Sequence, residues 1–551
     1  MKNLLLVLSI VSYCAFLDCV AAGDVSVEGA PIKGNSNNFS KGDNENSTDE
    51  LAQLKQNTQG AIKAFEKEQW EEGFRLSKKA DLKDKEIQFY LGVCYSLGRG
   101  TAKDECEAVK WFRKSAEQGD ARGQVSLGTC YEEGFGVIKE EIEAAKWYRR
   151  SAEQGNVLGQ ISLGWCYLEG LGVVKDENEA AKWYRRSAEQ SNALGQNSLG
   201  VCYLEGLGVA KDEPEAVKWF RRSVEQGDVL GQAVLGVCYL EGLGVAKDEK
   251  EAVKWFRKSA EQGNANGQAF LGSCYLDGLG VVKDEKEAVK WFRKSAEQGG
   301  KINLSYLNNL GVVSNGFGEK EGSAIGQCYL GECYAEGRGV AKDEAEAVKW
   351  YRKAAEQEDA DAQCNLGVCY EEGCGVAKDE REAFKWYRKA AEQGDATGQC
   401  LLGVCYDEGR GVAKDEREAF KWYRKAAEQG YATGQCNLGV CYAEGCGVAK
   451  DEREAFKWYR KAAEQGDAMG QCNLGLMYDE GRGVAKDDAE AVKWYRKAAE
   501  QGYASAQHNL GVCYADGEGV EKDEDEAVKW LRRAAEQGES AAKEALKRLG
   551  Y

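Results

Sequence analysis

The sequence predicts an all-α solenoid of about twelve 36-residue helix-turn-helix repeats in two arms of six. The leucine of an L-G-x-C-Y-like string recurs every 36 residues from Leu91 to Leu271, and again from Leu330 to Leu510. A tryptophan follows twenty residues after each of these leucines. A fixed period of this length is typical of repeat architectures, in which each unit stacks on its neighbours. Only the longer step from Leu271 to Leu330 interrupts the period, and it separates the two arms.

Composition agrees with many short helices. The 551 residues include 67 glycines and only two prolines, and 43% of the residues are hydrophobic. Glycine at this frequency with so little proline favours repeated helix-ending turns over disorder. The net charge of −18 and the even spread of lysine and arginine argue against nucleic acid or anionic membranes as partners.

One unit, residues 360–394, shows why each repeat should fold as two helices. Its first helix carries apolar residues on one face: Ala362, Leu366, Cys369 and Tyr370. Gly373 and Gly375 then provide a turn, because glycine accepts positive φ angles. Asp379 is placed to cap the second helix, with Glu382 completing a capping box. The second helix has its own buried stripe: Ala383, Trp386, Tyr387, Ala390 and Ala391.

These strings resemble the Sel-one-like repeat family, which is related to tetratricopeptide repeats. The resemblance rests on N-L-G-V-C-Y at 365–370, G-V-A-K-D at 375–379 and K-W-Y-R-K-A-A-E-Q-G at 385–394. It implies a right-handed α/α superhelix and a role as an adaptor protein. The sequence departs from the family in placing cysteine before the tyrosine in eleven copies; the eleventh copy has Met477.

The chain divides into seven expected segments. Residues 1–22 are typical of a secretory signal, because Lys2 precedes a short apolar stretch that ends in Val20-Ala21-Ala22. The stretch is shorter than the roughly 20 residues needed to span a bilayer. The remaining segments are a flexible linker (23–47), N-terminal capping helices (48–83), repeats one to six (84–299), an irregular insertion or hinge (300–322), repeats seven to twelve (323–539) and a C-terminal capping helix (540–551).

This leader predicts an exported protein, periplasmic or secreted, or in the ER lumen if the organism is eukaryotic. No later segment is long and apolar enough for stable membrane insertion.

The first-helix face opposite the core leucine should line the concave surface of such a solenoid. In the N-terminal arm this face is apolar, and an exposed apolar strip is a candidate for binding a protein or peptide partner. Its residues are Ile161, Trp165, Leu168, Val201, Leu204, Val237, Leu240 and Leu276. Trp165 is the strongest candidate, and the alternative is that these residues pack against neighbouring first helices.

A second column is polar and could clamp an extended peptide backbone. It consists of Asn365, Asn437, Asn473 and Asn509. The alternative is that these amides form hydrogen bonds within the scaffold.

Cysteine and histidine set the limits on chemistry. Eleven cysteines lie beside the repeat tyrosine and should behave as small core residues. A second column faces outward on a helical wheel and could form a redox or soft-metal surface: Cys364, Cys400, Cys436, Cys472 and then His508. However, cysteines in a C-x4-C spacing lie about 140° apart on a helix, so they cannot ligate one ion together. We therefore predict no metal site and no cofactor.

The leading prediction is an exported, non-enzymatic scaffold that binds a protein or peptide partner through its concave face. The resemblance leaves an exported, cysteine-rich hydrolase of the antibiotic-degrading type as one alternative. The single histidine, His508, counts against it, because it replaces a repeat cysteine and has no accompanying nucleophile motif. The soft-metal or thiol-binding surface is the other alternative.

Overall fold

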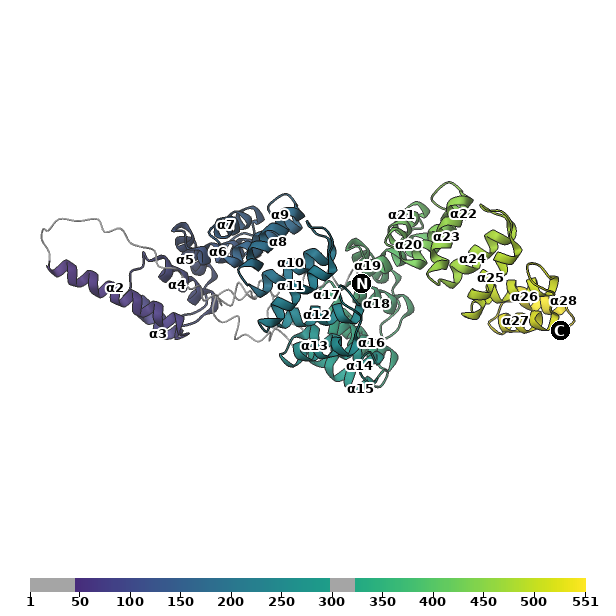
Figure 1. Ribbon diagram of the computed structural model, residues 1–551, viewed down its shortest axis with the longest axis horizontal. Helices are drawn as coiled ribbons and strands as arrows, with labels where there is room; N and C mark the ends of the chain where they lie inside the picture. Colours follow the sequence, from purple (N-terminus) through teal and green to yellow (C-terminus); the bar gives the residue numbers. More distant parts are fainter. Residues whose placement is uncertain (1–44, 298–322) are drawn as a thin grey trace. The chain divides into compact units, whose positions relative to one another are not determined.

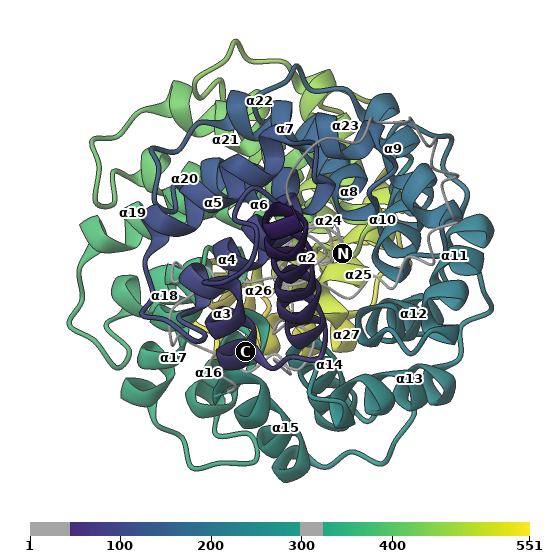
Figure 2. The same ribbon diagram turned by 90° about the vertical axis from the view of Figure 1, so that its left-hand side faces the viewer.

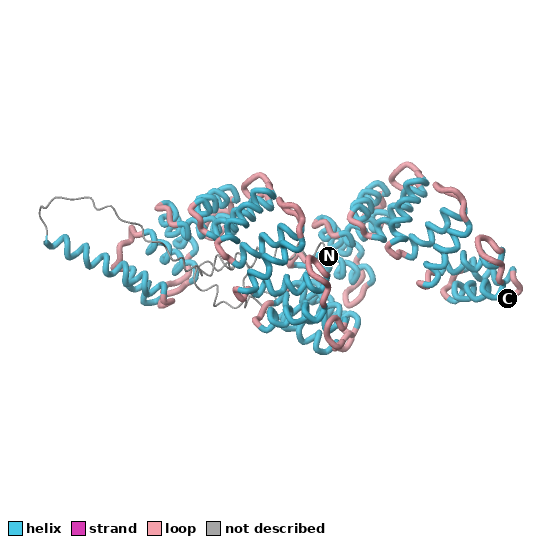
Figure 3. The backbone as a smooth tube through the Cα atoms, viewed as in Figure 1, coloured by secondary structure: helices cyan, strands magenta, loops and turns pink. Residues whose placement is uncertain are grey.

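The computed structural model describes residues 45–297 and 323–551 (Figure 1). Over these residues it contains 27 helices and no strand (Figure 3), which confirms the all-α repeat fold. The chain separates into two compact units, Met1–Tyr329 and Leu330–Tyr551. The predicted signal, nearly all of the linker and the 300–322 insertion lie outside the described residues. No helix in the described ranges combines the length and apolar character needed to cross a membrane.

The first unit holds two leading helices and six complete repeats. Their bounds are α2 (Glu45–Glu66), α3 (Trp70–Ser77), α4 (Lys85–Leu97), α5 (Glu105–Glu117), α6 (Ala121–Glu133), α7 (Glu141–Glu153), α8 (Val157–Glu169), α9 (Glu177–Glu189), α10 (Ala193–Glu205), α11 (Glu213–Glu225), α12 (Val229–Glu241), α13 (Glu249–Glu261), α14 (Ala265–Asp277) and α15 (Glu285–Glu297). Even numbers from α4 onwards are the first helices of repeats, and odd numbers are the second helices.

Helix α16 (Ala324–Glu336) spans the boundary between the units. The second unit continues with α17 (Glu344–Glu356), α18 (Ala360–Glu372), α19 (Glu380–Glu392), α20 (Ala396–Glu408), α21 (Glu416–Glu428), α22 (Ala432–Glu444), α23 (Glu452–Glu464), α24 (Ala468–Glu480), α25 (Asp488–Glu500), α26 (Ala504–Asp516), α27 (Glu524–Glu536) and α28 (Ser540–Arg548).

The leading helices α2 and α3 cover the first repeat. Helix α2 begins at Glu45, three residues before the expected start of this segment. Phe65 stacks on Tyr90 of the first repeat with ring centroids 4.9 Å apart, and Trp70 lies edge-on to the same tyrosine at 6.4 Å. Trp70 therefore packs against the end of the repeat array instead of occupying the repeat tryptophan position.

Capping residues set the helix ends in each repeat. The carboxylate of Asp379 accepts hydrogen bonds from the backbone N–H groups of Arg381 and Glu382, so the predicted N-cap is confirmed. Glu382 forms an ion pair with Lys385, one helical turn further on. Helix α18 ends at Gly373, whose φ of 77° lies in the left-handed region that favours glycine.

The core of a repeat lies between its two helices. Leu366 and Tyr387 are fully buried, and a Cβ atom added to Gly367 would overlap the Tyr387 ring. The tyrosine can therefore approach the first helix only because the residue there is glycine. The prediction that Trp386 is buried is wrong, because its side chain is only partly buried. The ammonium group of Lys389 lies over its ring, 4.1 Å from the centroid.

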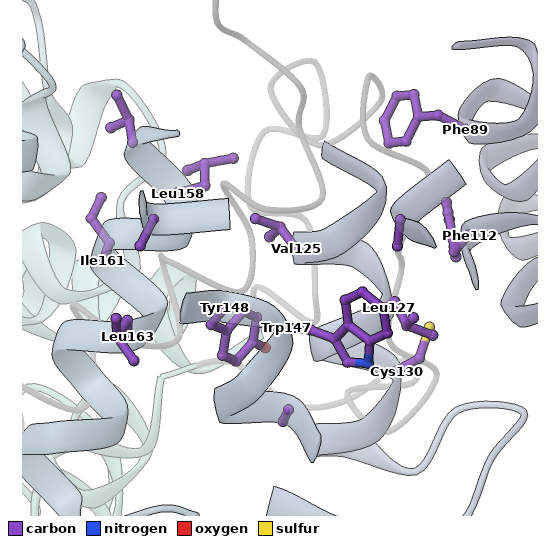
Figure 4. Packing of buried hydrophobic residues seen from close by; sticks show 14 of the residues in the cluster. Phe89, Phe112, Val125, Leu127, Cys130, Trp147, Tyr148, Leu158, Ile161 and Leu163 are labelled. Carbon is purple, nitrogen blue, oxygen red and sulfur yellow. The ribbon is translucent and has the colours of Figure 1, made fainter. Parts of the chain in front are cut away.

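Neighbouring repeats are joined by apolar packing and by a repeated glutamine bridge. Figure 4 shows Leu127, Tyr148 and Leu163 of successive first-unit repeats among the buried side chains. In the second unit, Gln363 donates to the Ala355 carbonyl of the preceding repeat at 3.1 Å and accepts from Gln393 of its own repeat at 2.8 Å. The same arrangement recurs along both units, so each repeat needs its neighbour to satisfy a buried amide.

The first helices form the inner layer of the first unit. In the end-on view of Figure 2, α8 and α10 lie inside α9 and α11. Consecutive first helices such as α8 and α10 also contact one another. This places the first-helix face on the inner wall, as the repeat pattern predicted.

The start of α16 packs on α15 in the way that other first helices pack on their predecessors. Gln327 donates to the Ala296 carbonyl at 3.3 Å, which matches the Gln363 bridge. The Tyr329 ring stacks on Phe292 with centroids 5.1 Å apart. These contacts lie within the first unit, and the hinge at 300–322 stays a prediction.

Candidate functional site

The predicted apolar strip in the first unit is mostly buried. The expectation that its side chains are exposed is wrong for six residues, and the alternative that these pack against their surroundings holds for them: Ile161, Leu168, Val201, Leu204, Val237 and Leu276. The physical reason is that consecutive first helices touch, so a residue on this face packs against the next first helix. Trp165 and Leu240 are partly buried, and Trp165 packs against the core.

The asparagine column forms hydrogen bonds within the scaffold. Amide nitrogens of Asn437, Asn473 and Asn509 lie 3.6–3.8 Å from the cysteine sulfur of the preceding repeat, namely Cys400, Cys436 and Cys472. Burial raises the pKa of the Glu332 carboxyl to about 7, and a hydrogen bond with Asn365 opposes this rise. A peptide clamp would have to compete with these internal contacts, and that role stays a prediction.

The second cysteine column does not face outward, so that expectation is wrong. Cys364, Cys400, Cys436 and Cys472 are all buried, because their face packs against the next repeat. Burial raises the pKa of Cys400 and Cys472 to about 12, and these thiols are protonated at neutral pH. A cysteine side chain binds a metal ion as its thiolate, so a protonated thiol is a poor ligand. Among the described residues, no three His, Cys, Asp or Glu side chains are grouped to hold a metal ion.

His508 continues this column but is only partly buried. Burial lowers the pKa of its imidazole. The charge of Glu539 opposes this shift.

The exposed part of the first-helix face lies in the second unit. Val368, two residues after the core leucine, is 41% exposed. The equivalent residues of the next four repeats are partly buried, and we call the five together the inner apolar row: Val368, Val404, Val440, Leu476 and Val512. The corresponding Val201 and Val237 of the first unit are buried.

Acidic residues run beside the inner apolar row. One helical turn after each member lies an exposed carboxylate: Glu372, Glu408, Glu444, Glu480 and Asp516. Arg410 and Arg482, in the turns that follow, pair with Glu408 and Glu480. The turns after Glu372 and Glu444 carry Cys374 and Cys446 at that position instead of arginine.

One buried carboxyl was not anticipated from the sequence. Glu132 accepts a hydrogen bond from the Tyr148 hydroxyl at 2.6 Å, while its Oε1 atom has no hydrogen-bond partner. Burial raises the pKa of this carboxyl to about 7. In the next four repeats of the first unit this position is leucine, and only that contrast within the unit could have singled out Glu132. The second unit has acids at the equivalent position in three repeats: Glu371, Asp407 and Asp479.

The comparisons with known proteins agree with this architecture. The Sel1 repeat model matches twelve consecutive segments, six over residues 86–300 and six over 324–539. A search of curated proteins returned no match.

Several solved structures are similar in sequence. The protein c5321, a protective antigen of uropathogenic Escherichia coli strains with an SLR fold, is 39% identical; the match covers 79% of this chain and 89% of c5321, with a TM-score of 0.46. A Sel1 repeat protein from Oxalobacter formigenes is 33% identical over 60% of this chain and 89% of its own length, with a TM-score of 0.40. Helicobacter pylori cysteine rich protein B is 34% identical over 23% of this chain and 92% of its own length, with a TM-score of 0.20.

Stacked two-helix units joined by shared core residues define a helical-repeat protein of the scaffold class. The twelve matched segments cover most of the chain, and the protein belongs to the Sel1 repeat family. Sel1 repeat proteins are generally scaffolds for protein interaction and typically not enzymes.

Proposed function

We propose that this protein is an exported, non-enzymatic adaptor that binds a protein partner on the inner first-helix face of its second unit. The observation that carries the proposal is the inner apolar row, with Val368 41% exposed. An apolar side chain left exposed at a repeated position is a candidate anchor for a partner. Export is supported by the signal-like pattern of residues 1–22.

The flanking carboxylates indicate which partner chemistry fits. The partner segment that fits has apolar residues beside lysine or arginine. Its apolar side chains would be buried against the inner apolar row, and its basic side chains would pair with Glu372 and Glu444. Charge complementarity of this kind raises the association rate and weakens with added salt. The same carboxylates would repel nucleic acid.

Site-specific photo-crosslinking tests the proposed face. A photo-reactive residue is placed at Val368 or Val440 in the full chain, and the protein is crosslinked in its native source. We expect both positions to crosslink the same protein, with a yield that falls as salt is raised. A photo-reactive residue at Val174, which is 88% exposed in a loop of the first unit, is the matched control.

Equal crosslinking from Val174, or none from Val368 and Val440, would rule out the proposed face. Export is tested separately by comparing the location of the full chain with that of a chain lacking residues 1–22. Retention of both forms in the cytoplasm would contradict that part of the proposal.

A further inference from the structure

Two cysteine pairs of the second unit lie across helix-ending turns. Helix α18 ends at Gly373, and the chain turns back so that the N–H of Cys374 donates to the carbonyl of Cys369 at 3.0 Å. Helix α22 ends in the same way, with the N–H of Cys446 donating to the carbonyl of Cys441 at 3.0 Å. In this turn the residue after the left-handed glycine commonly touches the residue that accepts its hydrogen bond.

The hydrogen bond limits how far apart the two cysteines of a pair can be. With standard bond lengths, a 3.0 Å N···O contact holds the two Cα atoms at most about 7 Å apart. Disulfides need Cα atoms within about 4.4–6.8 Å. Cys446 also packs on the cluster of buried residues that contains Cys441, so the two side chains share one environment.

The other C-x4-C spacings of this unit differ in this respect. Cys364 and Cys369 both lie inside α18, as Cys400 and Cys405 both lie inside α20. Five residues of continuous helix already rise about 7.5 Å, beyond disulfide range. Helix geometry therefore rules out a disulfide within these helical pairs, but it does not rule one out across the glycine turns.

Each pair combines one accessible and one buried thiol. Cys374 and Cys446 are partly exposed, while Cys369 and Cys441 are buried. An accessible thiol can attack a small-molecule disulfide and form a mixed disulfide. A neighbouring buried thiol can then displace the small molecule from that mixed disulfide. Burial raises the pKa of Cys369 to about 11, so the second step should be the slower one below that pH.

We propose that Cys369 with Cys374, and Cys441 with Cys446, are two redox-active dithiol pairs that close to disulfides by exchange with a small-molecule disulfide. The thiolate of Cys374 attacks one sulfur of the reagent disulfide, which breaks its S–S bond and releases one thiolate. Cys369 then gives up its proton and attacks the Cys374 sulfur of the mixed disulfide, releasing the second thiol. Two protein thiols are oxidised and one reagent disulfide is reduced to two thiols, and the 441–446 pair reacts in the same way.

Peptide mapping of the full chain provides the test. The reduced protein is incubated at pH 8 with oxidised glutathione, acid-quenched, alkylated and cleaved after glutamate. Cleavage after Glu371 or Glu372, and after Glu444, separates the members of each pair, so the fragments stay joined only through a disulfide. We expect both joined products, while Cys106, an exposed cysteine of the first unit, does not form a protein disulfide.

Substitutions identify the partners. Cys369→Ala should abolish the disulfide-joined product, and Cys374 should then carry glutathione. Cys364→Ala is the control and should leave the joined product unchanged. Arg410 lies at the equivalent turn position beside Cys405, with its N–H 2.9 Å from that carbonyl. Arg410→Cys should therefore create a third pair.

The proposal is overturned if Cys374 ends as the glutathione adduct in the unsubstituted protein, or if it joins any cysteine other than Cys369. It is also overturned if both accessible thiols stay free under conditions that modify Cys106.

Discussion

At the scale of single residues, close contacts decide which side chains the repeat accepts. The glycine that follows each core leucine faces a large side chain of the second helix. At Gly403, an added Cβ atom would overlap the Tyr423 ring. The helical glycine Gly60 of α2 differs, because its added Cβ would lie 3.9 Å from the nearest atom, the Leu76 Cδ1.

These two glycines give a matched prediction. Gly403→Ala should lower the free energy of unfolding by about 1–3 kcal/mol, because the tyrosine must move out of its packed position. Gly60→Ala should instead raise it by up to about 1 kcal/mol through helix propensity. Urea unfolding of both variants is the measurement, and a stabilising effect at both positions would contradict the packing argument.

Glu132 predicts a pH dependence of stability. Burial raises its pKa from 4.5 in the unfolded chain to about 7 in the folded protein. Between these values the folded protein binds more protons at this site, so the free energy of unfolding falls as pH rises through this window and levels off above it. Glu132→Gln keeps an acceptor for Tyr148 and removes the titration.

We therefore expect Glu132→Gln to change stability little at pH 4.5 and to raise it by up to about 3 kcal/mol at pH 8. Urea unfolding across this range is the measurement, with the exposed Glu153→Gln as control. Parallel stability profiles for Glu132→Gln and the unsubstituted protein would contradict the prediction.

The helical wheel predicted individual residues only in part. It placed Leu366 and Ala383 in the core correctly, because these face the other helix of the same repeat. It placed Cys364 and Val201 outside wrongly, because it treats a helix as having one buried face. A first helix in a stacked array is covered from several sides, and that becomes visible only once the neighbours are in place.

At the scale of the helix, capping is the property that the sequence predicted best. Asp379 caps α19 through its carboxylate, and the same arrangement recurs at Asp415 and Asp451. Helix α7 is an exception, because Glu140 at its N-cap makes no side-chain hydrogen bond to the helix. The longer glutamate side chain is a poor fit for the short reach that a cap requires.

Two opposite substitutions test this interpretation. Asp379→Ala should reduce the free energy of unfolding by about 1 kcal/mol, because two backbone N–H groups lose their acceptor. Glu140→Asp should increase it by about 0.5–1 kcal/mol by adding the missing cap. Thermal or urea unfolding of each variant is the measurement, and a loss of stability on Glu140→Asp would show that α7 starts differently.

At the scale of the whole molecule, each repeat is stabilised by contacts with its neighbours. Helix α28 covers the last repeat, with Ala542 buried against Leu531 and Ala534 of α27. The sequence located this final helix and all twelve repeats, because each depends on local strings and a constant period. The arrangement of the chain around 300–322 could not be inferred in this way, because no repeat string continues through it.

Deletion of residues 540–551 should uncover Leu531 and loosen the end of the array. Repeats contact mainly their neighbours, so the loss of hydrogen-exchange protection should be confined to α26 and α27. Amide exchange read out by mass spectrometry is the measurement. Loss of protection as far away as α18, or none in α27, would contradict nearest-neighbour coupling.

The glutamine bridge makes the array extensible in whole units. Gln399 donates to Ala391 of the preceding repeat and accepts from Gln429 of its own, and Gln435 repeats the pattern one unit on. If residues 396–431 were duplicated, each end of the inserted unit would carry the same glutamine donor and backbone carbonyl acceptor as the repeat that it replaces at that junction. The length of the inner wall could thus be changed in steps of 36 residues by inserting or deleting whole repeats, without redesigning the junctions between them.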